Sequence, residues 1–212
     1  MQIIPGLILS YLIGSFPTAY VLGRMVKGID IRRHGSGNVG ATNAFRALGK
    51  GPGLAVLLID IAKGALAVII FGPLLSLESI VECVLLGIAV VCGHNWTIFL
   101  RFKGGKGIAT SLGVLIGLAS KFPALRLVLS LTFLVWVLVF AVSRRVSLAS
   151  LAAALSLPCL MTLTGQVIEM IILGWIFCVF IFVRHWPNIQ RLARNEEPKI
   201  YFSSQKSPEQ PA

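Results

Sequence analysis

The stretch R-F-K-G-G-K-G-I-A-T, Arg101 to Thr110, is a basic loop that runs directly into an apolar segment, Ile108 to Ser120. Lys106 supplies a cation within it, and three glycines let the backbone adopt positive φ and approach a ligand closely: Gly104, Gly105 and Gly107. The free N–H groups expected of this loop and the positive end of the helix after it would face the same space, which predicts a phosphate site. The spacing is not that of a nucleotide-binding P-loop, and a plain interhelical turn is the alternative interpretation.

The composition places this loop in a membrane protein. Of 212 residues, 56% are hydrophobic and only 13% are charged, and the mean hydropathy is +0.87. Such a chain suits a bilayer rather than water. The net charge of +11 does not indicate a nucleic-acid partner, because cytoplasmic loops of membrane proteins collect Lys and Arg. The cysteines lie in apolar runs without paired spacing, which predicts neither a disulfide nor a zinc site: Cys83, Cys92, Cys159 and Cys178.

Seven apolar runs predict an all-α polytopic membrane protein with seven transmembrane helices: Ile3–Gly23, Gly53–Leu74, Ser79–His94, Gly107–Ser120, Pro123–Val142, Val146–Gly165 and Val167–Arg184. Ser15, Pro17 and Thr18 interrupt the first run and predict a kink there. The fourth run has 14 residues and reaches only about 21 Å. The glycine-rich loop before it should therefore lie at the membrane surface or slightly within it. We expect one domain over residues 1–202 and a disordered tail over 203–212.

Basic residues predict the orientation of these helices. With the N-terminus outside and the C-terminus cytoplasmic, 16 of the 19 Lys and Arg residues fall on the cytoplasmic side. Only three fall elsewhere: Lys63, Lys121 and Arg126. The motif-bearing segments, including short interfacial helices, should therefore gather on the cytoplasmic face.

The polar segment after the first run holds a second candidate site. G-S-G-N, Gly35 to Asn38, predicts a turn, and Asn38 is placed to cap the helix that follows. That helix has an apolar face and a polar line formed by Asn38, Thr42 and Arg46. One interpretation is a helix lying on the membrane surface. The other is a second anion site with four donor residues: Ser36, Thr42, Asn43 and Arg46.

Three polar residues inside the apolar runs need another explanation. Asp60 and Lys63 lie three apart in the second run, and we favour an ion pair that orients the helix over direct chemistry. His94 is favoured as a hydrogen-bonded helix-end residue rather than a base. No metal site is predicted, because the acidic residues near the basic loop are not paired at ligand spacing.

Three segments resemble one family, the bacterial acyl-phosphate-dependent glycerol-3-phosphate acyltransferases. They are G-S-G-N-V-G-A-T-N-A-F-R-A-L-G (35–49), G-H-N-W-T-I-F-L-R-F-K-G-G-K-G-I-A-T (93–110) and R-H-W-P-N-I-Q-R-L-A-R-N-E-E (184–197). The family commonly has proline where Thr97 stands and glycine where Asn195 stands. Because Asn is the next best residue for a left-handed turn, we expect Glu197 still to be placed correctly.

The resemblance implies acyl transfer from acyl phosphate to the 1-hydroxyl of glycerol 3-phosphate, giving lysophosphatidic acid and phosphate. It implies no cofactor, a location in the bacterial cytoplasmic membrane and an active site that faces the cytoplasm among membrane lipids. The implied catalytic residues are Ser36, Arg46, Lys106, His185 and Asn188. Asn38, Thr42, Asn43 and the three loop glycines are expected to bind substrate, and Glu197 to organise the last segment.

The histidines do not suggest the His–Asp mechanism of other glycerolipid acyltransferases. Five residues after His34, His94 and His185 come Val39, Phe99 and Gln190, so H-x-x-x-x-D is absent. An acyl phosphate is already activated, and the site needs mainly to position two anions and stabilise developing charge. A small-anion transporter or channel is the competing interpretation. The gathering of polar motifs at one face, without an evident repeat, favours the enzyme.

Overall fold

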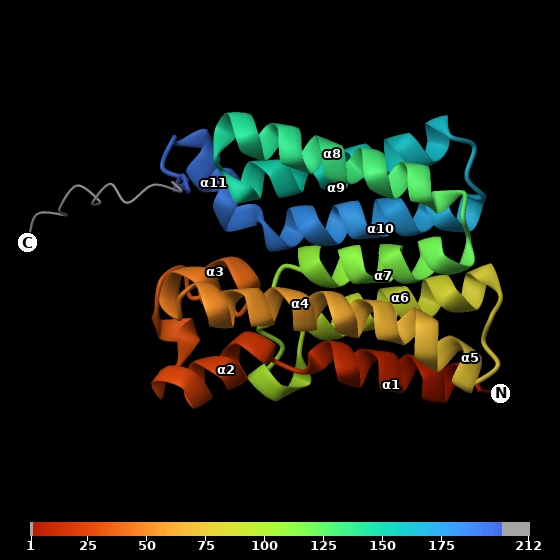
Figure 1. Cartoon of the computed structure of the whole chain (residues 1–212), viewed down its shortest axis with the longest axis horizontal. Helices are drawn as coiled ribbons and strands as arrows, with labels where there is room; N and C mark the ends of the chain where they lie inside the picture. Colours follow the sequence, from red (N-terminus) through yellow and green to blue (C-terminus); the bar gives the residue numbers. More distant parts are fainter. Residues whose placement is uncertain (1, 201–212) are drawn as a thin grey trace, which may run out of the picture.

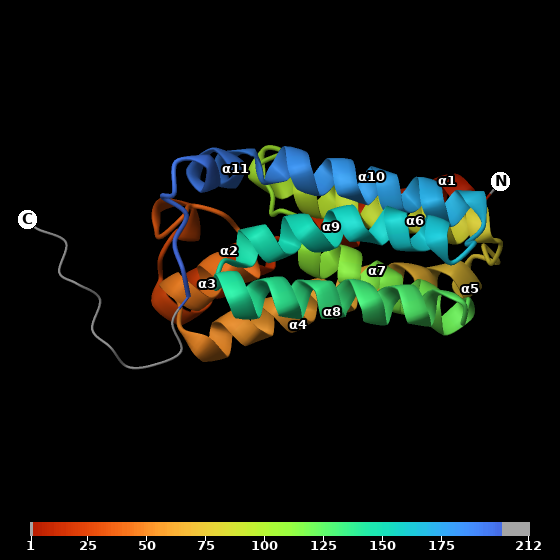
Figure 2. The same cartoon turned by 90° about the horizontal axis from the view of Figure 1, so that it is seen from above.

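The computed structural model describes residues 2–200, and the expected tail at 203–212 lies outside them. Most helices run side by side along one direction, which gives an elongated bundle (Figures 1 and 2). At one end lie α2 (Thr18–Lys27), α3 (Ala41–Ala47) and α11 (Trp186–Ala193); the N-terminus lies at the other. The expectation of an all-helical protein is confirmed over the described residues.

The first apolar run is broken as its sequence predicts. α1 spans Ile3–Ser15, and Phe16 and Pro17 separate it from α2. Two hydrogen bonds hold the end of α1 against the end of α6 (Ile80–Asn95). Ser15 Oγ donates to the Gly93 carbonyl over 3.3 Å, and Thr97 Oγ1 donates to the Ser15 carbonyl. The break therefore lies beside the start of the basic loop.

Close helix packing surrounds that loop. α4 (Lys50–Leu66) continues through a π-helical turn, η2 (Ala67–Phe71), into α5 (Gly72–Leu74), and packs along α7 (Ile108–Lys121). A Cβ on Gly64 would lie 2.2 Å from the Thr110 carbonyl oxygen. Because only glycine fits there, α4 and α7 approach each other backbone to backbone.

The second half of the bundle is formed by α8 (Leu125–Ser143), α9 (Val146–Leu163) and α10 (Ile168–Arg184). α10 and α11 meet at a bend of 63°, where Pro187 occupies the first turn of α11. α10 thus ends at Arg184, where the seventh apolar run was expected to end, and α11 follows as a separate helix. The main core is apolar and joins the two halves; its largest fully buried members are Phe177, Leu118, Leu125, Met161, Met170 and Leu173.

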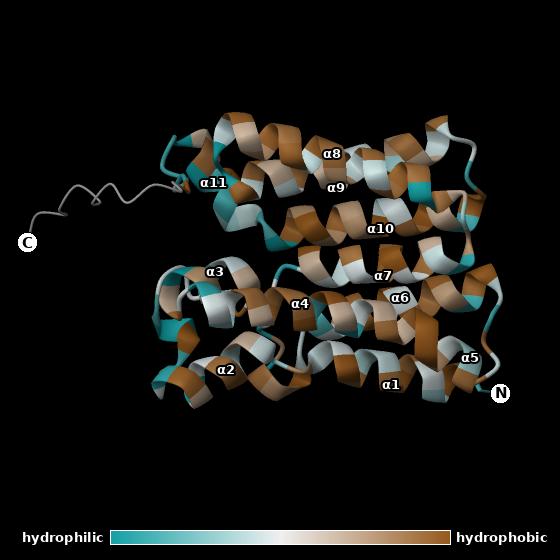
Figure 3. Ribbon diagram, viewed as in Figure 1, coloured by the Kyte–Doolittle hydropathy of each residue, from teal (hydrophilic) through white to brown (hydrophobic). Residues whose placement is uncertain are grey.

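Five helical segments of the described chain are long and apolar enough to cross a bilayer: Ile3–Lys27, Lys50–Leu74, Ile80–Leu100, Leu125–Ser143 and Val146–Leu163. The bent pair α10 and α11 gives a sixth if it counts as one span, whereas α7 is shorter. Hydrophilic colour gathers at the end that carries α2, α3 and α11, while apolar colour follows the helices (Figure 3). The polar motifs therefore share one end of the bundle, as the sequence predicts.

Candidate active site

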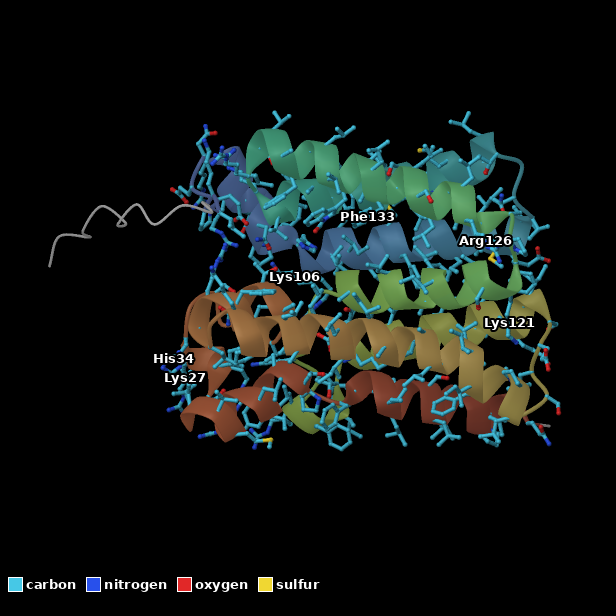
Figure 4. All side chains as sticks on the ribbon, in the orientation of Figure 1. Lys27, His34, Lys106, Lys121, Arg126 and Phe133 are labelled. Carbon is cyan, nitrogen blue, oxygen red and sulfur yellow. The ribbon has the colours of Figure 1, made fainter. Side chains whose placement is uncertain are left out.

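A cavity of about 810 Å³ opens at this polar end. Three segments that are distant in sequence form its walls: residues 30–38, the basic glycine loop (residues 101–107, "the glycine loop" below) and the α10–α11 bend. Six lining residues are basic, namely Arg32, Arg33, Lys103, Lys106, Arg184 and Arg191, against one acidic residue, Asp30. Figure 4 shows Lys106 between the two halves of the bundle, with Lys121 and Arg126 at the opposite end. A cavity with this charge favours an anionic ligand.

Lys106 is held by a chain of polar contacts from the C-terminal part of the protein. Its Nζ donates to Asn188 Oδ1 over 2.6 Å. Asn188 Nδ2 donates to Glu197 Oε1 over 2.7 Å, and Arg191 Nε donates to Glu197 Oε2 over 2.7 Å. Asn188 and Glu197 are buried. The carboxylate therefore orients the amide, and the amide orients the ammonium group toward the cavity.

The surroundings of Lys106 weaken its affinity for a proton. Burial lowers the pKa of Lys106 to about 8, Glu197 raises it, and the charges of Arg191, Arg46 and Arg184 lower it further. Lys106 therefore loses its charge as the pH rises through about 8. An anion bound in the cavity would restore the cationic form.

Arg184 and the end of α6 hold the backbone of the glycine loop by hydrogen bonds. Arg184 Nε donates to the Gly105 carbonyl over 2.9 Å, and its Nη2 donates to the Gly104 carbonyl over 2.7 Å. The Gly104 and Gly105 N–H groups donate to the carbonyls of Asn95 and His94. The expectation that these two N–H groups are free for phosphate is wrong, because the end of α6 already uses them.

Glycine is required in this loop for a different reason from the expected approach to a ligand. A Cβ on Gly104 would lie 2.0 Å from the His94 carbonyl oxygen, and one on Gly105 would lie 2.1 Å from His94 Nε2. Gly107 has φ +82° and is the N-cap residue of α7. Gly104 lines the cavity, and Gly105 and Gly107 lie behind it against α6. The glycines thus let the loop lie on α6 and carry Lys106 forward.

The segment before α3 contributes Ser36, Gly37 and Asn38 to the cavity wall. The expected cap is wrong: α3 begins at Ala41 with Gly40 at its N-cap, and no side chain caps it. Because the helix starts two residues later than expected, Asn38 lies in the preceding loop and lines the cavity instead.

Asn43 has a structural place rather than the expected substrate contact. Its Nδ2 donates to the carbonyls of Ile31, His34 and Asn38, over 3.3, 3.0 and 2.9 Å. Its Oδ1 accepts from the Ser36 N–H over 2.9 Å. The side chain is buried, and these bonds fold residues 31–38 around it. Asn43 therefore shapes the loop that presents Ser36.

Three other predicted residues lie outside the cavity wall, as its lining shows. Arg46 is exposed on α3 and acts on Lys106 through its charge. Thr42 is half-buried on the same helix. His185 is buried, and its Nδ1 lies 2.9 Å from the Ile181 carbonyl. Since only N–H can donate to that carbonyl, Nδ1 carries the proton. Burial lowers the pKa of His185 to about 4, so the ring is neutral near pH 7.

Glu197 is placed by the turn that its sequence predicts. Asn195 has φ +58°, which confirms the left-handed turn. Arg145 Nε donates to the Glu197 carbonyl over 3.3 Å, which ties the segment to the α8–α9 connection. Burial raises the pKa of Glu197, but Ser147, Asn188 and Arg191 together outweigh it and hold the pKa below its usual value. Glu197 is therefore a carboxylate near neutral pH.

Two cavity residues, Arg184 and Arg191, belong to the motif at 184–197, but no role was predicted for either. The excess of basic residues at one face was the signal that could have found them. Arg32 is already paired with Asp30, whose pKa its hydrogen bond holds well below the usual range. Among residues 2–200 no group of three His, Cys, Asp or Glu side chains is placed to hold a metal ion.

Comparison with known proteins agrees with this arrangement. The sequence model of a family described as glycerol-3-phosphate acyltransferase matches residues 4–195. A glycerol-3-phosphate acyltransferase of Desulforudis audaxviator is 46% identical over 194 residues, covering 92% of this chain and 93% of the relative. Another, from Synechococcus sp. (strain CC9902), is 43% identical with the same coverage.

Two solved structures share the fold. Crystal structures of PlsY, an integral membrane glycerol 3-phosphate acyltransferase, are described as its glycerol 3-phosphate and lysophosphatidic acid forms. The first superposes with a TM-score of 0.85 at 36% identity, and the second with 0.82 at 35%. Each match covers 95% of this chain and 96% of that structure. On the sequence match, the close relatives and the shared fold, the chain belongs to the glycerol-3-phosphate acyltransferase family.

Proposed function

We propose that the protein transfers a fatty acyl group from acyl phosphate to the 1-hydroxyl of glycerol 3-phosphate. The products are lysophosphatidic acid and inorganic phosphate. The observation that carries this proposal is the basic cavity in which Asn188, Glu197 and Arg191 hold Lys106. The relatives are named glycerol-3-phosphate acyltransferase, which supports glycerol 3-phosphate as the acyl acceptor. The chemistry of the cavity supports an anionic, already activated donor.

The cavity can hold the phosphate of acyl phosphate and the phosphate of glycerol 3-phosphate near the reacting carbonyl. Lys106 is the cation placed to hold the phosphate that leaves, and Ser36 and Asn38 line the same cavity. Arg46 adds positive charge from α3 and His185 supports the wall from behind, which refines their expected roles. Neutralising charge that grows on the phosphate and on the carbonyl oxygen lowers the barrier more than binding the ground state does.

The proton of the attacking hydroxyl goes to the substrate in this proposal. The oxygen bonds to the acyl carbon, the bond from that carbon to the donor phosphate breaks, and inorganic phosphate leaves. The phosphate of glycerol 3-phosphate, with a second pKa of about 6, accepts the proton. The protein groups nearby are poorly suited to this step, because His185 is neutral with a pKa of about 4 and Glu197 is engaged by Asn188 and Arg191.

The membrane topology we propose has seven crossings, with the N-terminus outside and the cavity on the cytoplasmic side of the bacterial inner membrane. The five long segments are joined by α10 and by the shorter α7, whose N-terminus carries the glycine loop. Most Lys and Arg residues lie at the cavity end, the side that cytoplasmic charge favours. A fatty acyl donor in the membrane and a soluble phosphate ester could then meet at this end.

A donor comparison tests the proposed function. Purified protein in lipid nanodiscs receives palmitoyl phosphate, palmitoyl-CoA or palmitoyl-acyl carrier protein, each with and without glycerol 3-phosphate. Lysophosphatidic acid and released phosphate are both measured. We expect equal amounts of the two products from palmitoyl phosphate only, dependent on glycerol 3-phosphate. Turnover with a thioester donor but not with acyl phosphate would overturn the proposed donor.

Two variants of His185 test the route of the proton. If the substrate phosphate accepts it, the acidic limb of the kcat/KM profile follows the phosphate's own pKa in the wild type and in His185→Gln alike. An acidic limb that disappears in both His185→Gln and His185→Ala would assign the proton to the imidazole. The transporter interpretation receives no support from the family to which the chain belongs.

A further inference from the structure

A buried polar cluster lies beneath the glycine loop, and no step of the proposed reaction uses it. Asp60 is 1% exposed, Lys63 4% and His94 7%. They belong to α4 and α6, two segments long and apolar enough to span a membrane. Charges in such a place are costly, and replacing a buried ion pair by well-packed apolar residues is often neutral or stabilising. Stability alone therefore does not account for the cluster.

Asp60 connects three parts of the fold at one carboxylate oxygen. Its Oδ1 accepts from Lys63 Nζ over 2.9 Å and from Thr18 Oγ1 over 3.0 Å, and it lies 3.7 Å from His94 Nδ1. Lys63 Nζ also donates to the Phe16 carbonyl over 3.2 Å. The expected ion pair is thus confirmed, and it joins α4 to the break after α1 and to the end of α6.

The His94 ring occupies the space between this ion pair and the glycine loop. Its Nδ1 edge faces Asp60, and its Nε2 edge is so close to Gly105 that an added Cβ would lie 2.1 Å away. The His94 carbonyl accepts from the Gly105 N–H over 2.9 Å. A separate cavity of about 10 Å³ is lined by Lys63, His94 and Gly105 among others. Contact is therefore continuous from the ion pair to the residue before Lys106.

We propose that Asp60 and Lys63 are positioning residues for acyl transfer: they fix the His94 ring, which supports Gly105 and so directs Lys106 into the cavity. This inference rests on the proposed function, and neither residue of the pair touches a substrate. The alternative is that the ion pair only orients α4. In that case its removal would leave the glycine loop, and hence the position of Lys106, unchanged.

The test replaces both partners at once, Asp60→Leu with Lys63→Met, so that no charge is left buried alone and the net charge is unchanged. The matched control is Glu78→Leu with Lys121→Met, a pair 3.6 Å apart and remote from the cavity. Figure 4 shows Lys121 at the other end of the bundle from Lys106. Each protein is assayed for palmitoyl phosphate turnover from pH 6 to 10 and for its thermal midpoint.

The expected result is a folded Asp60→Leu/Lys63→Met protein whose kcat/KM is reduced at least about tenfold, because a catalytic group displaced by a fraction of an ångström loses much of its effect. The basic limb of the profile should also move to higher pH, since a looser loop exposes Lys106 to water. A general folding defect would lower the rate at every pH without moving that limb. The control pair should match the wild type.

Wild-type kcat/KM together with an unmoved basic limb in the double variant would overturn the inference. If that variant does not fold, His94→Ala decides, because it leaves the ion pair intact and removes only the ring. A lower rate with a raised basic limb then supports the inference, and wild-type behaviour overturns it. Absence of turnover in the wild type itself would instead refute the proposed function.

Discussion

Replacing Glu197 by Gln should make Lys106 lose its charge at lower pH. The amide of Asn188 lies between the two groups: Lys106 Nζ donates to it over 2.6 Å, and it donates to the Glu197 carboxylate over 2.7 Å. The carboxylate is therefore within about 8 Å of Lys106 Nζ. At an effective dielectric constant of about 20, that charge is worth roughly 2 kcal/mol, or about 1.5 pKa units. Because Lys106 is partly exposed, solvent screening reduces the expected shift to about one unit.

The sign of the effect follows from the charge that is removed. The negative Glu197 raises the pKa of Lys106, which burial lowers to about 8, so its neutralisation must lower that pKa further. If the cationic form is the active one, kcat/KM falls as the pH rises through this pKa. At pH 8 about half of the wild-type lysine is charged, against about a tenth in Glu197→Gln, a fall of about fivefold beyond any loss at pH 6.

The assay is phosphate release from palmitoyl phosphate, with kcat/KM for glycerol 3-phosphate measured from pH 5.5 to 9.5. Glu196→Gln is the matched control, because this neighbouring carboxylate is exposed and its loss changes the net charge equally. We expect the basic limb of Glu197→Gln to move down by about one unit and that of Glu196→Gln to stay. A limb that moves up, or moves equally in both variants, would refute the account of Lys106.

Three further predictions concern the supports of the site. Arg184→Gln removes two hydrogen bonds to the glycine loop and should lower kcat/KM up to about 100-fold. Arg126→Gln also loses a hydrogen bond to a carbonyl but should not lower kcat/KM. Equal losses in the two variants would contradict the role of Arg184 in holding the loop. Gly105→Ala should reduce both the rate and the thermal midpoint, while Gly51→Ala, with nothing within 4 Å, should change neither. Asn195→Ala should lower the free energy of unfolding by about 1 kcal/mol because of its positive φ, while Asn195→Gly should retain wild-type stability and activity in chemical denaturation and turnover assays.

The sequence predicted the helices well because each depends on local pattern. Apolar runs locate the long helices, and Pro17 locates the break after α1. Length alone also identified α7 as too short for an ordinary span. The left-handed turn at Asn195 could be foreseen from the properties of that residue. These features need no knowledge of distant parts of the chain.

The details of the cavity could not be predicted because they depend on partners far apart in sequence. The Gly104 and Gly105 N–H groups were expected to be free, yet the end of α6 accepts both. Asn43 was expected to be a donor of a second anion site, but its buried side chain holds residues 31–38 instead. Arg184 belonged to a recognised motif without an assigned role, and its contact with the loop spans about 80 residues.

The most direct test of the account compares the wild type with Lys106→Ala and Lys121→Ala, using palmitoyl phosphate with and without glycerol 3-phosphate. We predict lysophosphatidic acid and phosphate in equal amounts from the wild type, and a loss on the order of 10³-fold in Lys106→Ala. Lys121→Ala, altered at the opposite end of the bundle, should remain within about twofold of the wild type. Wild-type turnover by folded Lys106→Ala, or phosphate release that does not require glycerol 3-phosphate, would contradict the account.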